Sequence, residues 1–167
     1  MRRTAKAAME AGVKPVVVVL GARADTITPA LAGLDPVRVI VNNDWSKGIA
    51  SSLVAGLSAV FADQGCEAVL VMLADQPFVD AAALQRLMAA FDNDHRIIAS
   101  TYGETVGVPA IFAREHADDL LRLTGDTGAG AWLRRRPKEV TRVPLAAAAH
   151  DVDTEIDASN LIHETPL

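Results

Sequence analysis

Apolar and polar residues follow one another in blocks along the chain, and the blocks have two lengths. Short apolar runs such as Val16–Leu20 and Ala68–Ala74 are typical of strands that are buried on both faces. Longer stretches such as Ser51–Phe61, with apolar residues three or four positions apart, are typical of amphipathic helices. The predicted strands cover residues 16–20, 37–41, 68–74, 97–100, 109–112 and 140–145, and the predicted helices cover residues 3–11, 28–32, 51–61, 80–91, 115–123, 128–135 and 159–164.

Strands that alternate with helices predict an α/β layered domain with a mostly parallel sheet. The 167 residues contain no low-complexity linker, so we expect a single domain over residues 1–167. Ligands of such sheets bind beyond the carboxyl ends of the strands. Polar residues that directly follow predicted strands, or that lie between later helices, therefore give four candidate sites.

The first two candidates contain carboxylates. Asp75 follows the predicted strand 68–74 and either binds Mg²⁺ or caps the turn that begins at Pro77. Asp153 lies with Asp151 on one side of an extended segment, either as a second carboxylate for the same metal or as part of a solvated acidic turn.

The other two candidates are loops that lead into helices. Residues 42–48 end in Lys47-Gly48 and precede Ser51-Ser52, and backbone N–H groups, hydroxyls and a lysine together favour an anion. The alternative is that Ser51 caps the helix and Trp45 packs as an apolar anchor. In the loop at 125–129, capping of the following helix by Asp126 or Thr127 is the simpler interpretation.

Composition removes several classes of function. The formal net charge of -5 and the pI near 5.3 argue against a nucleic-acid-binding surface. The single cysteine excludes an intrachain disulfide and a cysteine-based zinc site, and it fits the reducing cytoplasm. No apolar run is long enough for a membrane span, and charged residues interrupt the first residues where a secretion signal would be apolar. We therefore predict a cytoplasmic protein without membrane partners.

Taken in order, the motifs resemble the MobA-like NTP transferase family, and within it the molybdenum cofactor cytidylyltransferase (MocA-like) group. The matching segments span nearly the whole chain. They are residues 16–21, the segment NNDWSKGIASSL at 42–53, ADQP at 74–77, GVPAIF at 107–112, GDTGA at 125–129 and DVDT at 151–154.

The resemblance implies a Rossmann-like three-layer fold and Mg²⁺-dependent transfer of CMP from CTP (or of a nucleotide from GTP) to molybdopterin, with a molybdoenzyme as a further partner. It assigns the metal and the catalytic role to Asp75 and Asp153. It implies that Lys47, Gly48, Ser51 and Ser52 bind the nucleotide, and that Gly107, Pro109 and Asp126 lie on the acceptor side. A sugar-phosphate or isoprenoid nucleotidyltransferase, and a binding domain without catalysis, remain alternatives.

One part of the family pattern is absent from these 167 residues. Family members begin with an apolar strand and a Gly-rich loop that carries an Arg and, slightly later, a Lys, whereas Met1 here corresponds to the first helix. That strand is expected between the strands at 16–20 and 68–74, so its absence would leave two strand edges without partners. A truncated form, a start site placed too far downstream and a copy that has lost catalysis are the explanations left open.

Overall fold

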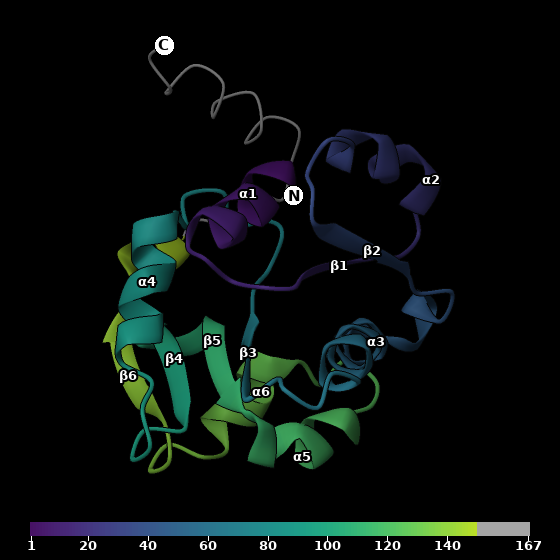
Figure 1. Cartoon of the computed structure of the whole chain (residues 1–167). Helices are drawn as coiled ribbons and strands as arrows, with labels where there is room; N and C mark the ends of the chain where they lie inside the picture. The colour runs from purple at the N-terminus through teal and green to yellow at the C-terminus, as the bar shows by residue number, and fades with distance from the viewer. Residues whose placement is uncertain (150–167) are drawn as a thin grey trace.

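Two β-sheets form the framework of the protein in the computed structural model, which describes residues 1–149. The smaller sheet pairs β1 (Val16–Leu20) in parallel with β2 (Val37–Val41). The larger sheet has the order β3-β5-β4-β6 (Figure 1). Its strands are β3 (Ala68–Val71), β4 (Ile97–Tyr102), β5 (Thr105–Ala113) and β6 (Thr141–Pro144).

The α/β class is confirmed, and the expectation of parallel pairing is met by β1–β2 and by β4–β6. Strand β5 instead runs antiparallel to both β3 and β4. The reason is local, because β4 ends at Tyr102 and β5 begins at Thr105. A connection this short can only form a hairpin, and Gly103 supplies the positive φ of 57° that the turn needs.

Helices cover both faces of the larger sheet. The α-helices are α1 (Arg2–Glu10), α2 (Ala24–Ile27), α3 (Ile49–Phe61), α4 (Ala81–Ala89), α5 (Ala117–Leu121) and α6 (Ala129–Arg134). Short 3-10 turns occupy Thr28–Leu31, Trp45–Lys47, Arg114–His116 and Ala146–Ala149. No helix within residues 1–149 combines the length and the apolar character needed to cross a bilayer.

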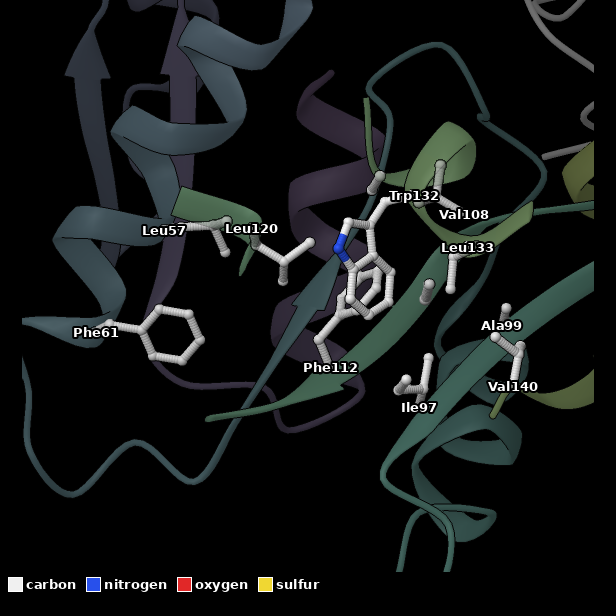
Figure 2. Packing of buried hydrophobic residues seen from close by; sticks show 12 residues of the cluster. Leu57, Phe61, Ile97, Ala99, Val108, Phe112, Leu120, Trp132, Leu133 and Val140 are labelled. Carbon is white, nitrogen blue, oxygen red and sulfur yellow. The ribbon is translucent and has the colours of Figure 1, made fainter. Parts of the chain in front are cut away.

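Alternate residues of β4 point into two different cores, which makes the domain three-layered. Ile97 and Ala99 pack with Phe112 and Trp132 against α3, α5 and α6, as Figure 2 shows. Ile98 packs on the opposite face, in the core that α1 and α4 close. The period-2 alternation of a strand explains this division, and it confirms the layered architecture predicted from the sequence.

Within the described residues, most predicted boundaries shift by one or two residues, and three elements differ by more. The strand expected at 109–112 begins at Thr105, because the hairpin turn is shorter than the loop predicted at 102–107. The helix expected at 28–32 begins earlier as α2 and continues into a 3-10 turn that contains Pro29. The strand expected at 68–74 ends at Val71, which pairs with Ala110. The next residue of β3 would face Pro109, and proline has no backbone N–H to donate to a ladder.

A cavity of about 530 Å³ lies between β1 and β3. Residues 16–19 of β1 and 68–74 along β3 line it consecutively. A cavity over one face of a sheet would be lined by every second residue, so the consecutive lining means that the two strand edges border the space. Within the described residues, β1 pairs with β2 alone and β3 with β5 alone, so the two expected open edges are present.

Candidate functional site

Asp75 lies past the carboxyl end of β3, four residues after Val71. Its Oδ1 atom is buried, and the preceding Ala74 lines the cavity wall. The amino group of Met1 donates a hydrogen bond to the Ala74 carbonyl oxygen at 3.1 Å. Burial lowers the pKa of this amino group, and the Asp75 carboxylate partly opposes that shift. The strand end thus presents a half-buried carboxylate.

This carboxylate fits a divalent metal as one of its ligands. Carboxylate oxygens are hard donors, and Mg²⁺ is typically bound through one or two carboxylates while it keeps several waters. The second predicted ligand, Asp153, lies outside the described residues. Within residues 1–149, no group of three His, Cys, Asp or Glu side chains comes together. Asp75 is therefore the part of the proposed metal site that can be placed.

The loop after β2 is held by a network of side-chain hydrogen bonds. The Nδ2 atom of Asn42, which is 7% exposed, donates to the hydroxyl oxygens of Ser51 (2.9 Å) and Ser52 (3.0 Å). The Ser51 hydroxyl in turn donates to the carbonyl oxygens of Asp44 (2.9 Å) and Gly48 (2.8 Å). Ser51 therefore ties the loop to the first turn of α3. The predicted capping of the helix by Ser51 is wrong, because the N-cap residue is Gly48 and no side chain accepts a capping hydrogen bond there.

The loops at 42–48 and 125–129, predicted as separate sites, form one unit. The backbone N–H of Ala50 donates to the carbonyl oxygen of Gly125 at 3.0 Å. Gly48 has a φ of +103°, and a Cβ there would lie 2.4 Å from the Gly125 carbonyl group and 2.7 Å from Asp126 Oδ1. Only glycine fits this contact, so the two loops meet backbone to backbone.

Two donors of this unit are used within the protein. The Ala50 N–H is bonded to Gly125, and Lys47 Nζ lies 2.9 Å from Asp44 Oδ1 in an exposed ion pair. An exposed pair contributes little stability, so a stronger anion can displace Asp44 from the lysine. The two loops are thus held together by hydrogen bonds within the protein, and Lys47 is a cation that can exchange Asp44 for another anion.

Gly107 and Pro109, predicted on the acceptor side, lie at a bulge between β4 and β5. Gly107 lines the cavity, and a Cβ there would lie 2.7 Å from the hydroxyl oxygen of Tyr102. Pro109 is buried, and its carbonyl oxygen accepts a 2.6 Å hydrogen bond from the Ser100 hydroxyl. Gly107 can therefore border a ligand, whereas Pro109 shapes the strand behind it.

The cavity connects residues from several of the predicted sites. Ser52 of α3, Gly107 of β5 and Gly128 before α6 all line it, and Ala74 brings in the strand end that carries Asp75. Asp126 is exposed and reaches this group through its contact with Gly48.

Two residues that matter to this arrangement were not singled out from the sequence. Asn42 organises the serines, and its position directly after an apolar strand is the signal that could have identified it. Gln76 is 1% exposed, and its Nε2 donates to the carbonyl oxygens of Val108 (3.3 Å) and Ala148 (2.9 Å). It thereby ties the end of β3 to β5 and to the turn at 146–149. No local pattern predicts that contact.

Known proteins match this chain along most of its length. Residues 1–140 match the family described as the MobA-like NTP transferase domain. Nicotine blue oxidoreductase from Paenarthrobacter nicotinovorans is 34% identical over 154 residues, which cover 86% of this chain and 72% of that protein.

Solved structures with a similar fold include Rv0371c from Mycobacterium tuberculosis H37Rv, with a TM-score of 0.78 and 28% identity over 98% of this chain and 83% of that one. Its manganese complex has a TM-score of 0.77 and 27% identity over 98% of this chain and 85% of that one. A nucleotidyl transferase from Methanothermobacter thermautotroptrophicus has a TM-score of 0.78 and 26% identity, and the match covers 95% of this chain and 76% of that one.

Proposed function

Because this chain belongs to the MobA-like NTP transferase family, we propose that it transfers CMP from CTP to molybdopterin and releases pyrophosphate. The chain is a nucleotidyltransferase of the MobA-like kind, and the proposal concerns its two substrates. The observation that supports it is Asp75, a half-buried carboxylate that follows the carboxyl end of β3, where ligands of such sheets bind.

In this reaction, a phosphate oxygen of the acceptor attacks the α-phosphorus of the nucleotide. A new P–O bond forms as the bond between the α-phosphorus and the bridging oxygen breaks, and pyrophosphate leaves with that oxygen. The acceptor phosphate is already anionic near neutral pH, so no Ser, Cys or His nucleophile is needed. A bound divalent metal supplies neutralisation of the charge on the phosphates.

The residues of this chain hold and orient the substrates. Asp75 would hold the metal at the strand end, with Asp153 as its proposed partner. The manganese complex of the M. tuberculosis relative supports a divalent metal, and we propose Mg²⁺ as the ion used here. We propose that Ser51, Ser52 and Lys47 contact the nucleotide and that Gly107 lies on the acceptor side, while the Gly48–Gly125 contact holds the loops at 42–48 and 125–129 together.

Two other functions remain candidates. A synthase from Anaerococcus prevotii, named 4-diphosphocytidyl-2C-methyl-D-erythritol synthase, has a TM-score of 0.74 at 12% identity, which supports a shared fold. An isoprenoid or sugar phosphate is therefore an alternative acceptor class. The second candidate is a binding domain that delivers cofactor to a molybdoenzyme without catalysis.

Calorimetric titration with CTP and GTP in Mg²⁺, followed by a pyrophosphate-release assay with molybdopterin, separates these functions. Tighter binding of CTP together with pyrophosphate release supports the proposed reaction. Binding without release supports the binding domain, and release with a sugar or isoprenoid phosphate alone supports the alternative acceptor. If neither nucleotide binds, the proposed function is wrong for this chain.

The role of Asp75 has its own test. Asp75→Asn removes one negative charge from the strand end, so the affinity for Mn²⁺ should fall by about tenfold or more and pyrophosphate release should be lost. Asp80→Asn is the matched control. Asp80 accepts a hydrogen bond from the Ala83 N–H as the cap of α4, and asparagine caps a helix equally well. If Asp75→Asn binds Mn²⁺ as the wild type does, Asp75 is not a ligand.

A further inference from the structure

Asp75 lies in a stretch of chain that neither a strand ladder nor a helix holds in place. Strand β3 ends at Val71 and helix α4 begins at Ala81, so residues 72–80 belong to neither element. A metal ligand has to keep its carboxylate in a fixed position, and hydrogen bonds and packing of the residues around it supply that order. The contacts of the next residue, Gln76, therefore bear on where the Asp75 carboxylate lies.

The Gln76 side chain is buried and reaches two other elements. It is 1% exposed, and its Nε2 donates to the carbonyl oxygens of Val108 on β5 (3.3 Å) and Ala148 in the turn at 146–149 (2.9 Å). These two acceptors fix which way the amide points, because only its nitrogen can donate to them. Since consecutive Cα atoms are about 3.8 Å apart, a residue held in this way also restricts its neighbour Asp75.

The backbone on both sides of Asp75 is held as well. The carbonyl oxygen of Gln76 accepts a hydrogen bond from the Val79 N–H at 3.3 Å, and Val79 is 1% exposed in the core that α1 and α4 close. On the other side, the Ala74 carbonyl oxygen accepts a hydrogen bond from the Thr4 hydroxyl at 3.3 Å. Asp75 thus lies between two residues whose polar groups are bound to other parts of the domain.

A purely structural role is the simpler interpretation of a buried glutamine. The Oε1 atom of Gln76 counts against it, because this buried atom has no hydrogen-bond partner within residues 1–149. A buried polar atom without a partner costs stability, and an apolar side chain of similar length would avoid that cost. A glutamine at this position is therefore better explained by what its Nε2 holds in place.

We propose that Gln76 is a positioning residue that holds the Asp75 carboxylate where it can bind the metal, an inference that rests on the proposed function. Gln76 acts through Asp75 and needs no contact with the metal or the substrates. Its two hydrogen bonds fix the chain directly after Asp75 against β5 and the turn at 146–149. Without them Asp75 would occupy several positions, and a ligand that has to be ordered on binding holds a metal more weakly.

Calorimetry with Mn²⁺ alone tests this role in the full chain. Gln76→Met keeps a side chain of similar length but removes the donor, so we expect the affinity for Mn²⁺ to fall by about tenfold. Ser100→Ala is the matched control, because Ser100 is 0% exposed and its hydroxyl donates to the carbonyl oxygen of Pro109, the residue after Val108 on β5. Both variants lose a buried hydrogen bond to β5 and should unfold at lower urea, but Ser100→Ala should change the Mn²⁺ affinity by less than about twofold.

A double variant separates positioning of the ligand from general loosening of the fold. In the Asp75→Asn background, Gln76→Met should have no further effect on Mn²⁺ affinity, because the ligand that Gln76 positions has already been lost. It should still lower the urea midpoint in that background. If Gln76→Met does not fold, Gln76→Asn takes its place. It keeps the amide on a side chain one carbon shorter, and the affinity should fall by about threefold.

Equal Mn²⁺ affinities of the wild type and Gln76→Met, equal losses in Gln76→Met and Ser100→Ala, or a further loss in the Asp75→Asn background would each show that Gln76 does not position the ligand. If Asp75→Asn weakens Mn²⁺ binding and Gln76→Met does not, the proposed function stands without this role. If Gln76→Met weakens it as expected but molybdopterin gives no pyrophosphate release, the role of Gln76 stands and the proposed substrates are wrong. If the wild type does not bind Mn²⁺, both fail.

Discussion

Gly48 shows how a single residue without a side chain holds the site together. Its φ of +103° lies in a region that residues with a side chain rarely adopt, and the Gly125 carbonyl group occupies the space a Cβ would need. The same contact places the Gly125 carbonyl oxygen on the Ala50 N–H. A side chain at residue 48 would therefore separate the two loops as well as strain the backbone.

Gly48→Ala should lower the free energy of unfolding by about 3 kcal/mol, because backbone strain and a backbone clash add together. Gly33→Ala is the control for strain alone. Gly33 also has a positive φ, of +75°, but nothing lies within 4 Å of its Cβ position, so we expect a loss of about 1 kcal/mol. Urea unfolding of both variants measures the difference, and equal losses would show that the contact with Gly125 contributes nothing.

Cys66 provides a second test at this scale. Burial raises the pKa of the Cys66 thiol, the Sγ atom donates to the Ala68 carbonyl oxygen at 3.3 Å, and the residue lines the cavity. The raised pKa means that fewer molecules carry the reactive thiolate at a given pH. Because the folded protein then binds more protons than the unfolded chain, the thiol's contribution to stability is lost as the pH rises through its folded pKa.

We therefore expect iodoacetamide to modify Cys66 several-fold more slowly at pH 8 in the folded protein than in urea, with the midpoint of the pH profile shifted upward. The chain has one cysteine, so the mass of the adduct reports this site alone. Equal rates in the two states would contradict a raised pKa.

At the scale of elements, the apolar runs predicted where strands form, while the pairing of the strands depended on residues elsewhere in the chain. Val16–Leu20 is a strand as predicted, because a run of β-branched residues favours a strand whatever the rest of the chain does. The sequence of β3 itself did not predict where the strand ends. Val71 is its last paired residue, and its partner Ala110 lies on a strand whose sequence is far from β3 along the chain.

At the scale of the whole molecule, the sequence located most of the candidate residues but not how they combine. Asp75 and Ser52 were predicted because each follows a strand or begins a helix whose pattern is local, whereas Gly107 was predicted from the family resemblance. The contact between Gly48 and Gly125 depends on how the loops before α3 and α6 meet, and no single segment of the sequence shows that meeting. The predicted role of Asp153 falls outside the described residues and stays a prediction.

The bulge between β4 and β5 also affects how the chain avoids misfolding. Sliding the hairpin by one residue would exchange the faces of β4, which would turn Ile98 toward Trp132 and take Ala99 out of that core. Ser100 is 0% exposed, and its hydroxyl donates to the Pro109 carbonyl oxygen. In the slipped hairpin this hydroxyl would lose its partner, and leaving a buried hydroxyl without a hydrogen bond costs about 1–3 kcal/mol of stability. The hydrogen bond between Ser100 and Pro109 therefore favours the native register of the hairpin. Only in that register does Gly107 line the cavity.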